Sequence, residues 1–135
     1  MIRVILGEKG TGKTKMLLDS MHAAVESEKG CVVFINNGGQ HMLDVSHRIR
    51  LVDSSEFAVE SFAEFYGLIS GILAQNFDVS YIFVDSITKI AKGSDAELEV
   101  MLEKLDALCK KFEVQVAMTI SMSAAAASDK IRSFA

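Results

Sequence analysis

Hydrophobic and polar positions follow two alternating patterns along this chain. Short, largely apolar runs occupy residues 2–6, 31–35, 81–84 and 114–120, and a shorter apolar pair lies at 51–52. Runs of this length predict strands that are buried on both faces, as in a parallel sheet. We therefore expect one strand at each long run and a minor strand at the pair.

Between these runs, apolar residues recur at spacings of three and four, which predicts amphipathic helices. The first helix is expected over residues 13–28. The second is expected to begin at Ser54 or Ser55, because serine is a favoured N-cap residue. The third is expected to begin after Ser94, which forms a capping box with Glu97.

Alternating strand and helix signals indicate an α/β fold. We expect a three-layer αβα sandwich with a mostly parallel central sheet. The chain has 135 residues, the size of one domain, so residues 1–135 are expected to form a single nucleotide-binding domain. Cys31 and Cys109 lie in a predicted strand and on the apolar face of a predicted helix, which favours buried, reduced thiols. The segment after Ser121 carries no pattern that assigns its structure.

Charge and hydropathy exclude several classes of protein. The chain carries 14 basic and 18 acidic residues, a net charge of −4, which argues against a nucleic-acid-binding surface over the whole domain. Charged residues interrupt every apolar run before it reaches the roughly 20 residues of a membrane span. Arg3 is followed by only three apolar residues before Gly7, too few for a signal peptide. We therefore expect a cytoplasmic protein.

The strongest chemical signal is the loop after the first predicted strand. It matches the phosphate-binding pattern G-x-x-x-x-G-K-[ST] at every fixed position, between a strand and a helix. Glycines let backbone N–H groups turn toward a phosphate, and the following helix adds the positive end of its dipole. Lys13 is expected to reach the β- and γ-phosphates of a nucleotide, and Thr14 to ligate Mg²⁺. A surface turn rich in glycine and lysine is the alternative interpretation. The candidate nucleotide contacts are Gly7, Glu8, Lys9, Gly10, Thr11, Gly12, Lys13, Thr14 and Lys15.

A phosphate-binding loop is usually partnered by an acidic residue at the end of a buried strand, which holds the Mg²⁺. Asp85 has this position, because the apolar run 81–84 precedes it. The carboxyl ends of parallel strands face the crevice where ligands bind in open α/β sheets. We therefore predict a Mg²⁺ site made by Thr14 and Asp85. Alternatively, Asp85 caps the next segment through Ser86 and Thr88.

At this strand end the sequence resembles a family. Asp85-Ser86-Ile87-Thr88 after an apolar strand is similar to the corresponding segment of the RecA/KaiC-like ATPases, a branch of the P-loop NTPases. The resemblance continues through the leucine-rich helix and the run 114–121, and covers most of residues 1–121. It implies a RecA-like core that binds ATP with Mg²⁺, with the Asp85 strand beside the strand that leads to Lys13. It also implies that Thr119 or Ser121 lies near the γ-phosphate as a sensor.

The polar segment 36–48 departs from this family. RecA-like hydrolases are expected to carry a glutamate here that polarises the attacking water, but no acid occurs before Asp44. Gln40 is the nearest counterpart, and an amide can orient a water but is a poor base. We therefore expect binding with slow turnover. The spacing of His41, Asp44 and His47 also fits a metal site on one helical face, with ordinary surface polar residues as the alternative.

The triplet Lys130-Ile131-Arg132 resembles the Lys-x-Arg finger that some RecA-like ring proteins offer to the nucleotide of a neighbouring subunit. This resemblance raises the hypothesis of a homo-oligomer or another protein partner. A solvated tail is the alternative interpretation.

Three functions fit these signals. The first is an ATP-binding, slowly hydrolysing module that switches with its nucleotide, in which Lys13, Gln40, Thr119 and Ser121 are the candidate catalytic residues. The second is a small-molecule kinase, which usually carries an arginine-rich lid, whereas arginine occurs here only at positions 3, 48, 50 and 132. The third is a non-hydrolysing nucleotide-binding adaptor. ATP is favoured over GTP because the chain lacks an Asn-Lys-x-Asp segment for reading guanine.

Overall fold

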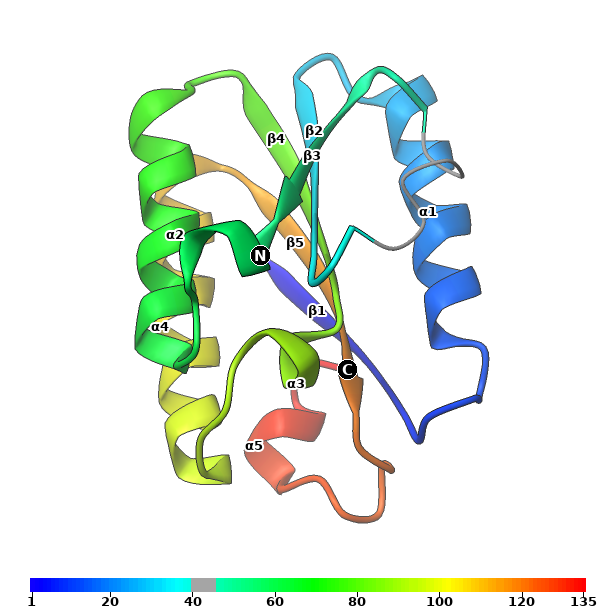
Figure 1. Cartoon of the computed structure of the whole chain (residues 1–135), viewed down its shortest axis with the longest axis vertical. Helices are drawn as coiled ribbons and strands as arrows, with labels where there is room; N and C mark the ends of the chain where they lie inside the picture. Colours follow the sequence, from blue (N-terminus) through cyan, green and yellow to red (C-terminus); the bar gives the residue numbers. More distant parts are fainter. Residues whose placement is uncertain (40–45) are drawn as a thin grey trace.

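The computed structural model describes residues 1–39 and 46–135, and its strands form one five-stranded sheet (Figure 1). Every pair of neighbouring strands is parallel, and the strand order is β1-β5-β4-β2-β3. All four main strands and the minor strand predicted from the sequence are confirmed. Their bounds are β1 (Ile2–Gly7), β2 (Cys31–Asn36), β3 (Ile49–Asp53), β4 (Val79–Asp85) and β5 (Gln115–Ser121).

Helices cover both faces of the sheet, as the sequence predicted. Figure 1 shows α1 on one side and α2 with α4 on the other. The helices are α1 (Lys13–Ser27), α2 (Phe62–Gln75), α3 (Ile87–Ile90), α4 (Asp95–Phe112) and α5 (Asp129–Arg132), with a short 3₁₀ helix, η2 (Ser54–Phe57), between β3 and α2. Within the two described ranges, no helix is long and apolar enough to cross a membrane.

The apolar runs of the central strands follow from burial on both faces. In β4, Phe83 packs under α1, while Ile82 and Val84 belong to the core under α2 and α4. All three side chains are fully buried. β2 alternates in the same way, with Phe34 facing α1 and Ile35 facing the other core. Continuous apolar sequence is therefore what this doubly covered sheet requires.

The two cysteines are free, and Cys109 is buried as predicted. Burial raises the pKa of its thiol to about 11, which keeps it protonated at neutral pH. Cys31 is only half-buried, because β2 begins at this residue near the surface.

The predicted start of the second helix is wrong. Asp53 caps η2 by accepting from the Ser55 amide, and η2 ends at Ala58, whose φ is 53°. α2 begins only after Ser61, which forms a capping box with Glu64. The pair Ser61 and Glu64 has the same S-x-x-E spacing that correctly placed the start of α4.

The predicted strand neighbours are also wrong, because β5 lies between β1 and β4. β5 is buried along most of its length and occupies an inner position, which leaves β1 at the edge of the sheet. Two outward N–H groups of β1 nevertheless find partners: the Ile2 amide donates to Asp106 Oδ1 and the Val4 amide to the Phe134 carbonyl, at 3.2 and 2.9 Å. These two bonds reduce the number of strand groups that the edge presents to other chains.

The C-terminal segment, which the sequence left unassigned, contributes to this cover. Ser128 caps α5 by accepting from the Ile131 amide, and the Ile131 side chain is fully buried in the core. Its burial fixes the segment whose Phe134 carbonyl pairs with β1.

Replacing Ile131 with alanine is expected to lower the free energy of unfolding by about 2–5 kcal/mol, because it leaves a cavity in the main core. Denaturant unfolding measures the change. Lys130→Ala on the same helix is the control and is expected to cost less than about 1 kcal/mol, because its ion pair with Glu103 is at the surface. Equal losses for both variants would contradict a docked α5.

Candidate functional site

The loop between β1 and α1 is folded around one backbone oxygen. The Glu8 carbonyl accepts hydrogen bonds from the Thr11 amide at 3.3 Å, the Thr11 hydroxyl at 2.7 Å and Lys13 Nζ at 3.0 Å. Gly10 and Gly12 have φ values of 86° and 85°, a conformation that favours glycine. The loop residues predicted from the pattern therefore form a closed turn. Glu8, at a variable position of the pattern, contributes its backbone rather than its carboxylate.

Lys13 begins α1, and its side chain is only 8% exposed. The start of α1 has no side-chain cap, whereas Ser61 and Ser94 cap α2 and α4. Amides in the first turn of a helix have no partner within the helix, and together with the helix dipole they attract an anion. The loop thus presents amide groups and one buried lysine at the same helix start.

Asp85 joins the loop to two strands of the sheet. Its Oδ2 accepts from the Thr14 hydroxyl at 3.0 Å, and its Oδ1 accepts from the Thr119 hydroxyl at 2.7 Å. The residues come from β4, α1 and β5. The strand registers bring them together, because Val84 pairs with Met118 and Gly7 with Ser121 at the carboxyl ends of the strands.

Asp85 does not cap the segment that follows it, which was the alternative interpretation of this residue. The hydroxyls of Ser86 and Thr88 lie 2.8 Å apart and bond to each other. No side chain caps α3, and Asp85 is committed to Thr14 and Thr119. The Asp85–Ser86 peptide bond is cis.

A hollow of about 220 Å³ lies over this arrangement. This volume is smaller than that of most sites that enclose a whole ligand, so the hollow fits only the charged end of a ligand. Its side chains carry three positive charges against one negative charge, which favours an anion. The lining residues are Lys9, Gly10, Gly12, Lys13, Thr14, Asp85, Ser86, Lys89 and Ser121.

Other hollows are larger, and two of them, of about 300 and 480 Å³, have a different character. One lies between α2 and α4, and the other between α2 and β3. Both are lined mainly by apolar side chains, and neither includes a residue of the loop between β1 and α1. Size alone therefore does not point to the polar hollow; its chemistry does.

The predicted sensor residues occupy different places. Ser121 lines the hollow, and its backbone amide donates to the Thr88 hydroxyl at 3.3 Å. Thr119 is fully buried and lies behind Asp85, to which it donates. Lys15, included among the candidate contacts, directs its side chain to Asp19 in a surface ion pair at 3.0 Å. Lys89, on α3 four residues after Asp85, also lines the hollow and was missed by the sequence analysis, because no motif includes it.

Two sequence hypotheses involve residues 40–45, which lie outside the described residues. These are the role of Gln40 as a water-orienting amide and the metal site of His41 and Asp44 with His47. In the described part of the chain, no group of three or more histidine, cysteine, aspartate or glutamate side chains could hold a metal ion.

The carboxyl ends of β2 and β3 carry few groups that could act as a base. Asn36 pairs in register with Asp85, and the Asn37 amide group donates to the Lys89 carbonyl at 3.2 Å. Asp53, at the end of β3, accepts from the Ser55 hydroxyl and from the amides of Ser55 and Gly38. These hydrogen bonds, with that from the Ser55 side chain the largest cause, lower the pKa of Asp53 and make it a weak base.

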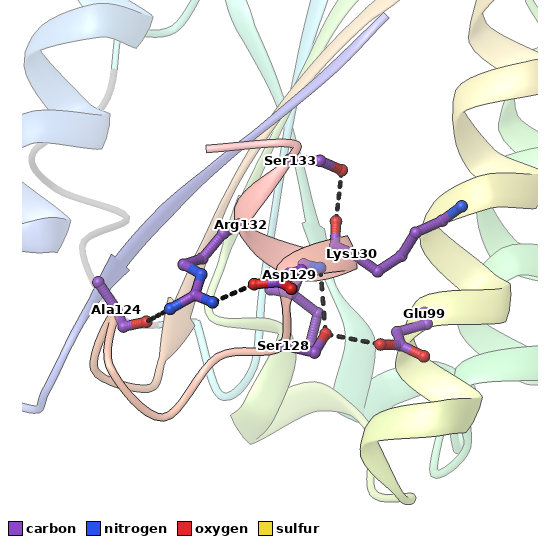
Figure 2. A network of polar contacts seen from close by, with 8 residues as sticks. Glu99, Ala124, Ser128, Asp129, Lys130, Arg132 and Ser133 are labelled. Atoms are coloured by element: carbon purple, nitrogen blue, oxygen red, sulfur yellow. Dashed lines mark hydrogen bonds and ion pairs between the residues drawn. The ribbon is translucent and has the colours of Figure 1, made fainter.

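The Lys-x-Arg triplet is engaged within its own chain. Lys130 forms an ion pair with Glu103 on α4. Figure 2 shows Arg132 bonded to Asp129 and to the Ala124 carbonyl, and the Ser128 hydroxyl bonded to Glu99. Neither cation lines the hollow. In this structure the triplet therefore fastens α5 to the body of the protein.

Gly7 is the loop position where a side chain has no room. A Cβ there would lie 2.5 Å from the Thr11 hydroxyl and 3.2 Å from Lys13 Cγ. Gly7→Ala is expected to lower the free energy of unfolding by about 1–3 kcal/mol. Denaturant unfolding measures the change.

Gly67→Ala provides the matched control, because a Cβ at Gly67 would meet no atom within 4 Å. It lies inside α2 and is expected to stabilise the protein by up to about 1 kcal/mol. If Gly7→Ala were as stable as Gly67→Ala, the tight packing at Gly7 would be contradicted.

The sequence matches none of the protein-family models to which it was compared, and no curated protein is detectably similar to it. The resemblance to the RecA/KaiC-like ATPases therefore rests on the two motifs and remains a hypothesis.

Proposed function

We propose that this protein binds Mg·ATP as a P-loop NTPase of the RecA-like class, hydrolyses it slowly and acts as a nucleotide-switched module. The observation that carries the proposal is the convergence of Lys13, Thr14 and Asp85 on one hollow at the carboxyl ends of the strands. Two motifs separated by about seventy residues meet there, and each is of the type that a nucleotide phosphate or its Mg²⁺ requires.

The distance between the Thr14 hydroxyl and Asp85 Oδ2 suits Mg²⁺. The ion demands octahedral ligands at about 2.0–2.1 Å, so two adjacent ligand oxygens lie about 3 Å apart. The observed separation is 3.0 Å. When bound, Mg²⁺ would neutralise charge on the phosphates, with Thr14 and Asp85 as the residues that hold it and Thr119 fixing the other carboxylate oxygen.

Slow turnover follows from the groups around the hollow. Asp85 is the only acidic residue among its described lining side chains, and it is assigned to the metal. The Asp53 carboxylate is held by three donors and has a lowered pKa. Without a further carboxylate among the residues described around the hollow, orientation of the attacking water would depend on a polar group such as the amide of Gln40.

No observation favours the kinase alternative. The arginines at positions 3, 48, 50 and 132 do not line the hollow, and Arg48 pairs with Glu26 and the Val25 carbonyl on α1. A kinase would need such side chains over the transferred phosphate.

Titration calorimetry with ATP, ADP, GTP and GDP, with and without Mg²⁺, tests the proposal. Micromolar binding of Mg·ATP is expected, together with phosphate release at roughly 10⁻⁴ to 10⁻² per second. Binding without release would replace the ATPase by a non-hydrolysing adaptor, and transfer of labelled phosphate to a nucleoside would replace it by a kinase. Absence of binding to all four nucleotides would overturn the proposal.

A further inference from the structure

Lys89 lines the hollow from α3 and adds a positive charge to those of Lys9 and Lys13 from the phosphate-binding loop. It lies on α3, four residues after Asp85, and is exposed. Within residues 1–39 and 46–135, its ammonium group makes no hydrogen bond or ion pair. Its neighbour Lys92, in contrast, donates to the Thr88 carbonyl at 3.1 Å. Lys89 thus contributes an unused donor to a site that attracts anions.

The backbone that carries Lys89 is held on several sides. Ile87 and Ile90 are buried at 0% and 4% exposure and anchor α3 to the core. The Lys89 carbonyl accepts from Asn37 beyond β2, and the Thr88 hydroxyl accepts from the Ser121 amide of β5. With its Cα fixed by these contacts, Lys89 can only extend outward, into the hollow and the solvent above it.

The position of Lys89 relative to the metal residues identifies which phosphate it would meet. In P-loop NTPases the Mg²⁺ bridges the β- and γ-phosphates. Lys13 and the loop glycines line the hollow from the loop and α1, while Asp85, Ser86, Ser121 and Lys89 line it from β4, β5 and α3. A terminal phosphate that extended from the loop toward β5 and α3 would meet Lys89, whereas a diphosphate would end nearer to the loop.

We propose that Lys89 binds the γ-phosphate and makes the site selective for nucleoside triphosphate over diphosphate. This inference rests on the proposed function. Lysine suits the role, because its ammonium is a compact charge that contacts phosphate without fixed geometry. The site would then distinguish ATP from ADP at α3, which is linked to the end of β2 through Asn37 and to β5 through Thr88.

Binding of a non-hydrolysable ATP analogue and of ADP, both with Mg²⁺, tests the inference in the full-length chain. Lys89→Ala and Lys89→Gln are expected to weaken binding of the analogue about tenfold and to leave ADP binding within about twofold. Lys89→Arg keeps the charge and is expected to retain most of the selectivity. Lys92→Ala, which removes an equal charge just after the end of α3, is expected to change neither affinity.

The outcomes separate this inference from the proposed function. The inference is overturned if wild-type protein binds both nucleotides and the Lys89 variants lower both affinities equally or lower neither. Lys89 would then contribute only to the overall positive charge of the site. If wild-type protein binds neither nucleotide, the proposed function fails first. Circular dichroism of each variant shows whether it is folded, so a loss of affinity is not mistaken for unfolding. The Lys89→Arg variant repeats the test with the positive charge in place.

Discussion

Replacing Lys13 with alanine is expected to weaken Mg·ATP binding by about a hundredfold or more. Its side chain is 8% exposed and is held 3.0 Å from the Glu8 carbonyl, so it is directed before any ligand arrives. A charged hydrogen bond contributes about 1.5–3 kcal/mol, and one ammonium can reach two phosphates. The loss is therefore expected at about 3 kcal/mol, measured by titration calorimetry.

The fold is expected to survive this change. The Glu8 carbonyl keeps its two hydrogen bonds from Thr11, so the loop stays closed without the lysine. Lys111→Ala, at the far end of α4, removes the same charge where it lies over the Phe112 ring and is the matched control. Similar weakening by both variants would show that net charge, and not the position of Lys13, governs binding.

Replacing Asp85 with asparagine is expected to abolish the dependence of ATP affinity on Mg²⁺ and to reduce phosphate release about a hundredfold or more. The substitution keeps the shape of the side chain and an oxygen that Thr14 or Thr119 can bond, so the protein should remain folded. It removes the negative charge that a hard cation requires. Titrations at several Mg²⁺ concentrations, with phosphate-release assays, measure both effects.

Asp19→Asn is the control for this change. Asp19 is exposed on α1 and pairs only with Lys15 at the surface, so the variant is expected to keep the Mg²⁺ dependence of wild type. An Asp85→Asn protein whose ATP affinity still rises with Mg²⁺ would contradict the assignment of Asp85 to the metal.

The strands could be predicted because a strand that is buried on both faces has a continuous run of apolar residues. Phe83 faces α1 while Ile82 and Val84 face α2 and α4, so the whole of β4 is apolar. The order of the strands in the sheet could not be predicted from such a pattern. β1 and β5 are both apolar runs, and nothing in the sequence shows that β5 would separate β1 from β4.

The start of α2 was missed although a signal was present. Ser61 and Glu64 form the same box that identified the start of α4, but Ser54 and Ser55 come first in the chain and are also good caps. The structure distinguishes the two candidate starts by the short turn that ends at Ala58. This residue has a positive φ, which no sequence rule indicates.

The phosphate-binding loop and its acidic partner were predictable from local motifs, and the structure brings Thr14 and Asp85 within 3.0 Å. Details that depend on tertiary packing were not predictable. Thr119 and Ser121 were both candidate sensors, and the sequence did not show that Thr119 would donate to Asp85 while Ser121 lines the hollow. The C-terminal segment was unassigned because the four residues of α5 carry one buried side chain, Ile131, which makes no periodic pattern.

The central claim is that the loop from Gly7 to Thr14 encloses the phosphates of Mg·ATP. Backbone amide chemical shifts, recorded by nuclear magnetic resonance during titration with Mg·ATP, test it most directly. The largest changes are expected in residues 8–15 and 85–89, saturating at one nucleotide per chain and requiring Mg²⁺ for their full size. Changes centred on the apolar hollow between α2 and α4, or no changes at millimolar nucleotide, would contradict the claim.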